Sequence, residues 1–336
     1  MELWFGTFPE IGRPARLAAL LEAEGWDGLA LTDSQSLAGD VFVGLALAAH
    51  TTRHLKLATG ATNLSTRHPA VVAAAMATVQ AESSGRAVLG VARGDSALAY
   101  LGRPPQPLAG FGTGLEQLQA YLRGDAVDVE GYASRIEWLA RSRQPKVPVS
   151  VAATGPRIIG LAARLAERVT FSVGAQVERL QWAMQRARTA RSAAGLDPTG
   201  VRLGAYVNAV AHPNVERARE LVRGRLGVYA RFASMHQNAL HTLAEADRAE
   251  VQRLAGHYDM AQHGTATAHH AEQLDAAFID RFGIAGPSEL VADRLLELRE
   301  LGLDHVIVVG HGRDAPFEIL AESIRRFGRE VIPQLK

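Results

Sequence analysis

Residues 147–165 read VPVSVAATGPRIIGLAARL and contain one complete strand-to-helix unit. The run 147–152 is short and rich in valine, which is typical of a strand buried on both faces. Pro156 stands where the first position of a helix is expected. Four apolar residues then follow at helical spacing: Ile158, Ile159, Ala162 and Leu165. This unit predicts a parallel strand joined to its neighbour through a helix.

The same unit recurs along the chain. Eight strands are predicted, at residues 3–8, 28–32, 55–62, 87–92, 147–152, 169–173, 201–210 and 305–309. Parallel strands need crossover helices, so eight repeats with short connections favour a closed α/β fold, the (β/α)₈ TIM barrel. A doubly wound open sheet is the alternative. We expect residues 1–336 to form a single domain, with an insertion before the last strand, at 236–280, as a candidate lid.

Composition narrows the class of protein. The formal net charge is +1, which gives no electrostatic reason to expect nucleic acid or an anionic membrane as a partner. The chain has no cysteine, which excludes disulfides, thiolate nucleophiles and iron–sulfur clusters. The chain has no run of about 18 consecutive apolar residues, which a membrane-spanning helix would need. We therefore expect a cytoplasmic protein that acts on a small molecule.

The loops after the strands are where a barrel of this kind carries its chemistry. After the fifth strand come Ala153, Thr154, Gly155 and Pro156. A glycine before a proline-initiated helix leaves backbone N–H groups free, and these donors suit a phosphate at the positive end of the helix dipole. The alternative is an ordinary turn that begins a helix with proline.

The loop after the fourth strand contains Gly94, Asp95 and Ser96. In the functional interpretation its backbone wraps closely around a ligand while Asp95 and Ser96 supply polar contacts. In the alternative, the loop is a solvated turn whose side chains bond their own backbone.

Small residues end the third strand, which reads Gly60, Ala61, Thr62 and Asn63. Small side chains allow a flat ring to approach the backbone at this point. Alternatively, Gly60 only marks a β-bulge.

The histidines raise the question of a metal site. Four of the 12 histidines crowd into residues 257–270 of the insertion: His257, His263, His269 and His270. Their spacing matches no tight metal motif, so a surface loop or lid is the favoured interpretation and no metal is expected. His68 follows the small-residue end of the third strand. It is either a catalyst or a core or capping histidine.

Two motifs together resemble a known family. They are TNLSTRHP at 62–69 and GRAVLGVARGDS at 85–96, and both are similar to the bacterial luciferase-like flavin oxidoreductases. More narrowly, they resemble the branch related to methylenetetrahydromethanopterin reductase. The segments HYDM at 257–260 and FGIAGP at 282–287 are also similar to that branch.

The resemblance implies a (β/α)₈ barrel with a long insertion before the last strand, assembled as a homodimer. It implies FMN or the deazaflavin coenzyme F420 as cofactor, and mostly coenzyme F420 in this branch. A bulge, often with a non-proline cis peptide, supports the back of the cofactor ring, and by position it falls at Gly60-Ala61, beside Thr62 and Asn63. The ribityl chain and phosphate are expected at the loops after the fourth, fifth and sixth strands, at Gly94, Asp95, Ser96, Ala153, Thr154, Gly155, Pro156, Gly174 and Ala175.

The chain departs from the family pattern after the second strand. Many members carry His or Glu directly after an acidic residue there, whereas this chain has Asp33 and Ser34. Serine is a poor acid or base at neutral pH, so the proton donor is left open between His68, Asp33, Ser34 and a group of the substrate.

The hypothesis is hydride transfer by coenzyme F420 to or from a C=C, C=N or C=O group of a small organic substrate. An FMN-dependent monooxygenase of the same fold is one alternative, and a non-catalytic flavin-binding protein is another. A sugar-phosphate barrel enzyme is a third, although lysines for a Schiff base are few: Lys56, Lys146 and Lys336.

Overall fold

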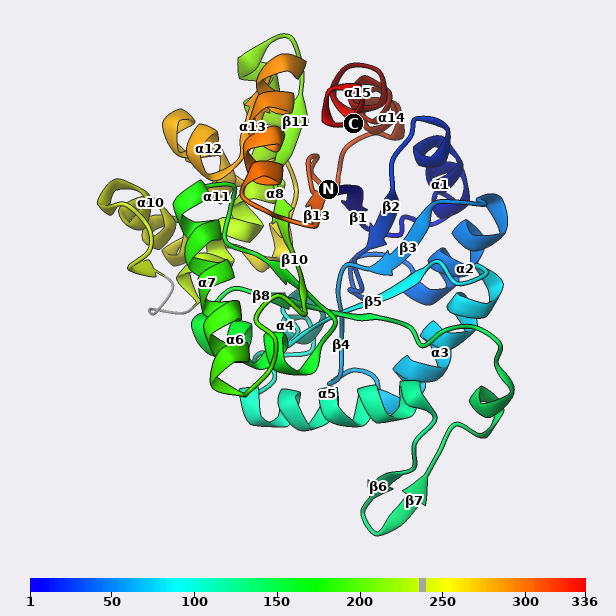
Figure 1. The fold of residues 1–336 in the computed structure, drawn as a ribbon. Helices are drawn as coiled ribbons and strands as arrows, with labels where there is room; N and C mark the ends of the chain where they lie inside the picture. Colours follow the sequence, from blue (N-terminus) through cyan, green and yellow to red (C-terminus); the bar gives the residue numbers. More distant parts are fainter. Residues whose placement is uncertain (236–239) are drawn as a thin grey trace.

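A closed ring of eight parallel strands forms the centre of the computed structural model (Figure 1). The structure describes residues 1–235 and 240–336, so the first four residues of the expected insertion lie outside the described residues. The ring strands are β1 (Glu2–Thr7), β2 (Gly28–Leu31), β3 (Lys56–Thr59), β5 (Ala87–Ala92), β8 (Val149–Ala153), β9 (Arg168–Phe171), β10 (Arg202–Val207) and β13 (His305–Val308).

The strand order confirms the barrel. Neighbours follow the order β3-β2-β1-β13-β10-β9-β8-β5, and a further pairing of β3 with β5 closes the ring. In the register of the first and last strands, Glu2 lies opposite His305. At the closing pair, Leu57 lies opposite Ala87. The open sheet is therefore excluded.

Helices surround the ring (Figure 1). The crossovers are α1 (Pro14–Ala23), α2 (Val41–Thr51), α3 (Pro69–Glu82), α5 (Leu108–Arg123), α6 (Pro156–Leu165), α7 (Val177–Ala193), α8 (Val215–Ser234) and α13 (Ser288–Glu300). The chain ends in α14 (Phe317–Arg326), the π-helical turn η3 (Phe327–Val331) and α15 (Ile332–Leu335). Proline occupies an initial position in α1, α3 and α6, where its missing N–H costs no hydrogen bond.

Two predicted strands are broken in the structure. The run expected at 55–62 is divided into β3 and β4 (Thr62–Asn63) by a cis peptide bond between Gly60 and Ala61. The run expected at 201–210 divides into β10 and β11 (Ala209–Ala211). Instead of continuing in the ring, β11 pairs with β12 (Ile284–Gly286), a strand that the sequence pattern did not predict.

Two excursions leave the barrel. Residues after α5 form a small antiparallel hairpin of β6 (Val127–Val129) and β7 (Tyr132–Ser134), followed by the 3₁₀ turn η1 (Glu137–Arg141), and the hairpin projects away from the ring (Figure 1). The described part of the insertion contains α10 (Glu245–Gly256), the 3₁₀ turn η2 (Met260–Gln262), α11 (His269–Glu272) and α12 (Ala276–Phe282). Contacts of α10, α11 and α12 with α8 hold this insertion against the barrel.

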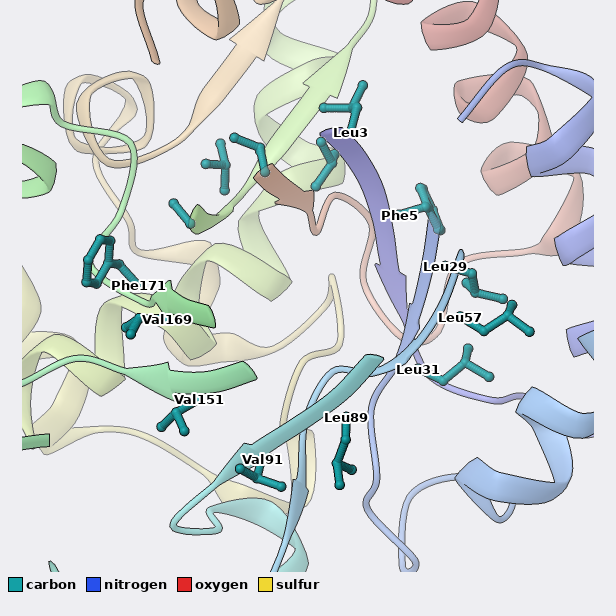
Figure 2. Packing of buried hydrophobic residues seen from close by; sticks show 14 of the residues in the cluster. Leu3, Phe5, Leu29, Leu31, Leu57, Leu89, Val91, Val151, Val169 and Phe171 are labelled. Atoms are coloured by element: carbon teal, nitrogen blue, oxygen red, sulfur yellow. The ribbon is translucent and has the colours of Figure 1, made fainter. Parts of the chain in front are cut away.

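Side chains alternate between two cores. Leu3 and Phe5 of β1 point outward to the surrounding helices, with Leu29 and Leu57 of the next strands (Figure 2). Trp4, between them, belongs to a second buried cluster that continues into α8 and the insertion. This is the period-2 pattern of a strand covered on both faces.

Charged groups close the amino-terminal end of the ring. The carboxylate of Glu2 lies 2.8 Å from Lys56 Nζ, 2.8 Å from Arg168 Nη2 and 3.0 Å from Arg202 Nη2. These cations more than offset the effect of burial, so the pKa of Glu2 lies well below its usual range. Just inside, the His305 imidazole contacts Thr170 Oγ1 at 2.9 Å. Among the described helices, none has the length and apolar character that crossing a membrane requires.

Candidate functional site

A cavity opens at the carboxyl end of the strands, where barrels of this kind carry their ligand sites. Its lining comes from loops after several strands and from α8. Among the residues predicted from sequence, it includes Asp33, Gly60, Ala61, Thr62, Asn63, Gly94, Asp95 and Ser96. A second cavity of about 1000 Å³ adjoins it and shares Gly94, Asp95 and four other lining residues. Thr154 lines this second cavity.

The wall after β3 has the small-residue character expected from the sequence. The Gly60-Ala61 peptide bond is cis, as the resemblance implied. Thr32 Oγ1 donates to the Gly60 carbonyl at 3.3 Å, and the Gly60 N–H donates to Leu31 O at 2.6 Å. A flat ring can therefore approach the backbone here without meeting a large side chain.

The loop after β2 is tied to this wall. Asp33 is buried, and its Oδ2 accepts from Thr62 Oγ1 at 2.6 Å and lies 3.3 Å from Arg67 Nε. Ser34 Oγ lies 2.9 Å from Ser96 Oγ. The candidates Asp33 and Ser34 are thus brought together with Thr62 and Ser96.

The loop after β5 is shaped by Gly94, which has a φ of +86°. In addition, a Cβ at this position would lie 2.6 Å from Leu98 Cδ1, so both conformation and space favour glycine. Asp95 follows and accepts from Arg231 Nη1 of α8, at 2.9 Å to Oδ1 and 3.0 Å to Oδ2. The Arg231 guanidinium also lies 4.7 Å from the Tyr258 ring centroid. This loop is therefore connected to α8 and the insertion.

The second cavity reaches the start of α6. No side chain caps this helix at Gly155, so its first N–H groups keep their donor capacity. Arg93 also lines the cavity. Its pKa is lowered by burial and by the neighbouring Arg157, and among the described residues neither arginine has an acidic partner. Backbone donors and the Arg93 cation suit a phosphate.

Six predicted site residues support the walls rather than line either cavity. Ala153 ends β8, Gly155 is the N-cap of α6, and Pro156 is its first residue. Gly174 and Ala175 pack against α12, where the Ala175 N–H donates to Phe282 O at 2.8 Å. Ser34 is fully buried behind Ser96.

The structure does not bring His68 to the cavities. Its side chain is exposed at the N-cap of α3, where Nδ1 accepts from the Ala70 N–H at 3.2 Å. This is the capping alternative that the sequence left open.

Several lining residues were not predicted from sequence. Arg225, Val228, Tyr229 and Phe232 present one face of α8 to the first cavity. Their spacing of three and four residues is the available signal, because it places an arginine within an apolar stripe. Tyr206 also lines the cavity, beside Phe8, which the sequence places after the first strand, and His263 of the expected lid.

Burial sets the protonation of these groups. Burial raises the pKa of Tyr229 to about 12, although the nearby Arg225 partly opposes the shift. Burial also raises the pKa of Tyr206. The pKa of His263 is lowered to about 3 by burial and by Arg225, Arg231 and Arg313. At neutral pH both tyrosines therefore keep their O–H donors and His263 is uncharged.

The described residues hold no group of three or more His, Cys, Asp or Glu side chains arranged for a metal ion. What they do hold is a cavity with a flat, small-residue wall and an adjoining, phosphate-compatible extension at a helix start. Together with the closed parallel barrel, these features are those of a barrel enzyme whose ligand site lies at the carboxyl end of the strands and has room for a planar ligand with an anionic tail.

Comparison with known proteins agrees with this class. Residues 6–305 match the luciferase-like monooxygenase family, and the chain belongs to that family. A 5,10-methylenetetrahydromethanopterin reductase from Archaeoglobus fulgidus is 26% identical over 322 residues, which span 94% of each chain.

Solved structures share the fold. The coenzyme F420-dependent tetrahydromethanopterin reductase from Methanopyrus kandleri superposes with a TM-score of 0.79 at 20% identity, covering 100% of this chain and 99% of that one. The FMN-bound oxygenating constituent of 3,6-diketocamphane monooxygenase from Pseudomonas putida gives 0.69 at 18% identity, with coverage of 99% and 98%.

Proposed function

We propose that this protein binds coenzyme F420 and catalyses hydride transfer to or from a small organic substrate. The observation that carries the proposal is the continuity of the two cavities, which run from the wall at Gly60-Ala61 to the uncapped start of α6. A planar ring with a phosphate-bearing chain has this shape. The likeness to a coenzyme F420-dependent tetrahydromethanopterin reductase favours the deazaflavin over FMN.

The residues fit that cofactor. We place the ring against Gly60 and Ala61, with Thr62 and Asn63 at its edge. Gly94 and Asp95 line both cavities, Ser96 lines the first one beside them, and this loop suits the ribityl chain. Thr154 and Arg93 are placed to hold the phosphate, with the backbone N–H groups of α6. When bound, the cofactor would supply or accept the hydride; the barrel orients the substrate and excludes water.

We propose Tyr229 as the residue that donates a hydrogen bond or proton to the substrate. It lines the first cavity, and no described residue forms a hydrogen bond with its hydroxyl. Its raised pKa keeps that proton in place at neutral pH. This assignment replaces His68, which caps α3 on the surface.

We propose that residues 1–336 act as one domain and that the described part of the insertion covers the mouth as a lid. His263 lines the cavity. Tyr100 Oη donates to the Met260 carbonyl at 2.6 Å, which joins the insertion to the loop after β5. The Arg313 N–H donates to Gly264 O at 2.8 Å, which joins it to the loop after β13.

A homodimer is the expected assembly. Val43 and Leu47 of α2 and Val71 of α3 are exposed at 60%, 49% and 56%, on helices that contact each other. Exposed apolar patches favour association. Sedimentation of the wild type and of Val43→Glu tests this: a monomeric wild type contradicts it.

The decisive experiment is an anaerobic titration with coenzyme F420 and, separately, with FMN. We expect retention of the deazaflavin and weaker binding of FMN; the reverse preference favours a monooxygenase. A protein that holds coenzyme F420 but turns over no carbonyl, imine or alkene substrate is a non-catalytic flavin-binding protein.

A matched pair of variants locates the phosphate. Thr154→Val should weaken coenzyme F420 binding, whereas Thr113→Val, at an exposed position of α5, should leave it unchanged. Equal affinities in the two variants would argue against the placement at α6.

A further inference from the structure

One arginine in the first cavity has no counter-charge. Arg225 lies on α8, is 4% exposed and lines the cavity. Within residues 1–235 and 240–336, no group accepts a hydrogen bond from its guanidinium and no carboxylate pairs with it. The guanidinium instead stacks on an aromatic ring: Arg225 Cζ lies 4.6 Å from the centroid of the Phe8 ring. A buried charge without a partner is costly, so its presence requires an explanation.

The groups around Arg225 do not neutralise it. Tyr229 and Tyr258 face it and remain protonated, because burial raises the pKa of both. The pKa of Arg225 is itself lowered by burial and by Arg313, a second cation. Arg231 is also near, but its charge is taken up by Asp95. The cavity wall on this side therefore carries excess positive charge.

The insertion holds Arg225 away from water. At Gly224 a Cβ would lie 2.2 Å from Thr265 O, so glycine allows the backbone of the insertion to pack directly on α8. Gly264 lies above the guanidinium, since a Cβ there would be 3.5 Å from Arg225 Nη1. In such a site of low dielectric constant, an anion is attracted more strongly than at an exposed surface.

The position of Arg225 separates it from the cofactor's phosphate. In the ring of eight strands, β3 and β10 occupy opposite positions. The wall at Gly60-Ala61 follows β3, whereas α8 follows β10 and β11. Arg225 therefore stands across the cavity from the proposed ring support. It lines the first cavity and not the second, where Thr154 and Arg93 lie.

We propose that Arg225 binds an anionic group of the substrate, a carboxylate or phosphate, so that the protein acts on small organic anions. The proposal rests on the proposed function, because it assigns the substrate side of the same cavity. The guanidinium offers a planar, bidentate donor set that matches either anion. Phe8 and Tyr229 fix the side on which the reacting carbon lies.

The test measures anion binding by calorimetry on the full chain saturated with coenzyme F420, which fills the phosphate-compatible cavity. The probes are malonate for the carboxylate arm and inorganic phosphate for the phosphate arm. The variants are Arg225→Gln, Arg225→Lys and, as control, Arg217→Gln, which removes an exposed arginine from the same helix.

We expect the wild type and Arg217→Gln to bind one probe with equal affinity. Arg225→Gln should bind it at least about ten-fold more weakly, and Arg225→Lys should lie between, because lysine keeps the charge but not the fork of donors. The probe that binds names the anion class. Unchanged affinity in Arg225→Gln, or no binding of either probe by the wild type, overturns the proposal.

A thermal measurement distinguishes a structural role. Removal of an unpaired buried charge should leave the melting temperature of Arg225→Gln equal to the wild type's or higher. A clear drop, together with unchanged anion affinity, also overturns the proposal. If coenzyme F420 does not bind, the proposed function fails by itself. In that case malonate and phosphate affinities are compared between the cofactor-free wild type and cofactor-free Arg225→Gln, and the difference between them is the contribution of Arg225.

Discussion

The two ends of the barrel treat buried charge in opposite ways. At the amino end, the Glu2 carboxylate is surrounded by Lys56, Arg168 and Arg202, all within hydrogen-bond distance. At the carboxyl end, the Arg225 guanidinium faces a cavity and has no acidic partner among the described residues. Both groups are largely shielded from water, so the difference lies in pairing and not in exposure.

This contrast separates stability from function. A buried charge that is fully paired within the protein cannot pair with a ligand. An unpaired buried charge is retained where a ligand supplies the opposite charge. We therefore expect substitutions at the amino end to lower the free energy of unfolding and to spare binding. Substitutions at the mouth should weaken binding or turnover and change the free energy of unfolding less.

The largest effect on stability is expected for Trp4→Ala at the amino end. Trp4 is 1% exposed, and its removal leaves a cavity inside the ring. The free energy of unfolding should fall by about 3 to 5 kcal/mol. Urea denaturation measures it, and coenzyme F420 affinity of the folded protein should stay unchanged. If Trp4→Ala lost as much coenzyme F420 affinity as the variants at the mouth, the two ends of the barrel would not differ in the way proposed.

Glu2→Gln should lower the free energy of unfolding by about 3 kcal/mol at pH 7, because Arg168 is left without its carboxylate in a buried place. The pKa of Glu2 is lowered in the folded protein, so its contribution is complete above the ordinary value of 4.5. That contribution declines as pH falls below this value. Urea midpoints at pH 7 and pH 3 check this: the gap between wild type and variant should narrow at pH 3, and a constant gap contradicts it.

At the mouth, Tyr229→Phe should lower kcat by about 100-fold, because a donor to the substrate is lost. The variant keeps the ring, so the melting temperature and coenzyme F420 affinity should stay close to the wild type's. Stopped-flow measurement of cofactor absorbance with a turned-over substrate gives the rate. His68→Asn is the control, and a larger effect there than in Tyr229→Phe would restore the histidine as proton donor.

The smallest effect is expected for Asp95→Asn, which removes the carboxylate that pairs with Arg231. Both side chains are partly exposed, at 19% and 16%, so the free energy of unfolding should fall by only about 1 to 2 kcal/mol. Because Asp95 lines both cavities, coenzyme F420 should bind more weakly. Fluorescence titration measures this, and weakened stability with unchanged cofactor affinity would contradict the placement of this loop.

The sequence predicts the framework because strand burial and helical spacing are local patterns. All eight ring strands lie where valine- and leucine-rich runs predicted them, and Pro156 begins its helix as expected. The hairpin of β6 and β7 was not predicted, since three-residue strands such as 127–129 show no clear alternation. The pairing of β11 with β12 joins segments far apart in the chain, which no local pattern indicates.

The sequence predicted those residues of the cavity lining that follow strand ends. Gly60 and Thr154 come directly after strands and Asp95 lies in the loop after β5, so the position of the strands in a barrel indicates them. Arg225 and Tyr229 lie in the third and fourth turns of a long helix, and His263 lies in the insertion. Their approach to the cavity depends on how α8 and the insertion pack, which is a through-space property. His68 is the opposite case. It follows β4 in sequence, but its side chain caps α3 and points away from the cavities.

The pairing of β1 with β13 has a consequence for synthesis. During translation the first strand emerges long before its partner, because Glu2 of β1 pairs with His305 of β13. Until β13 emerges, β1 and β10 each present an unpaired edge, and an open sheet of this kind is a template for wrong pairing with other chains. Ring closure therefore waits for β13, and the growing chain is most exposed to aggregation just before that strand is made.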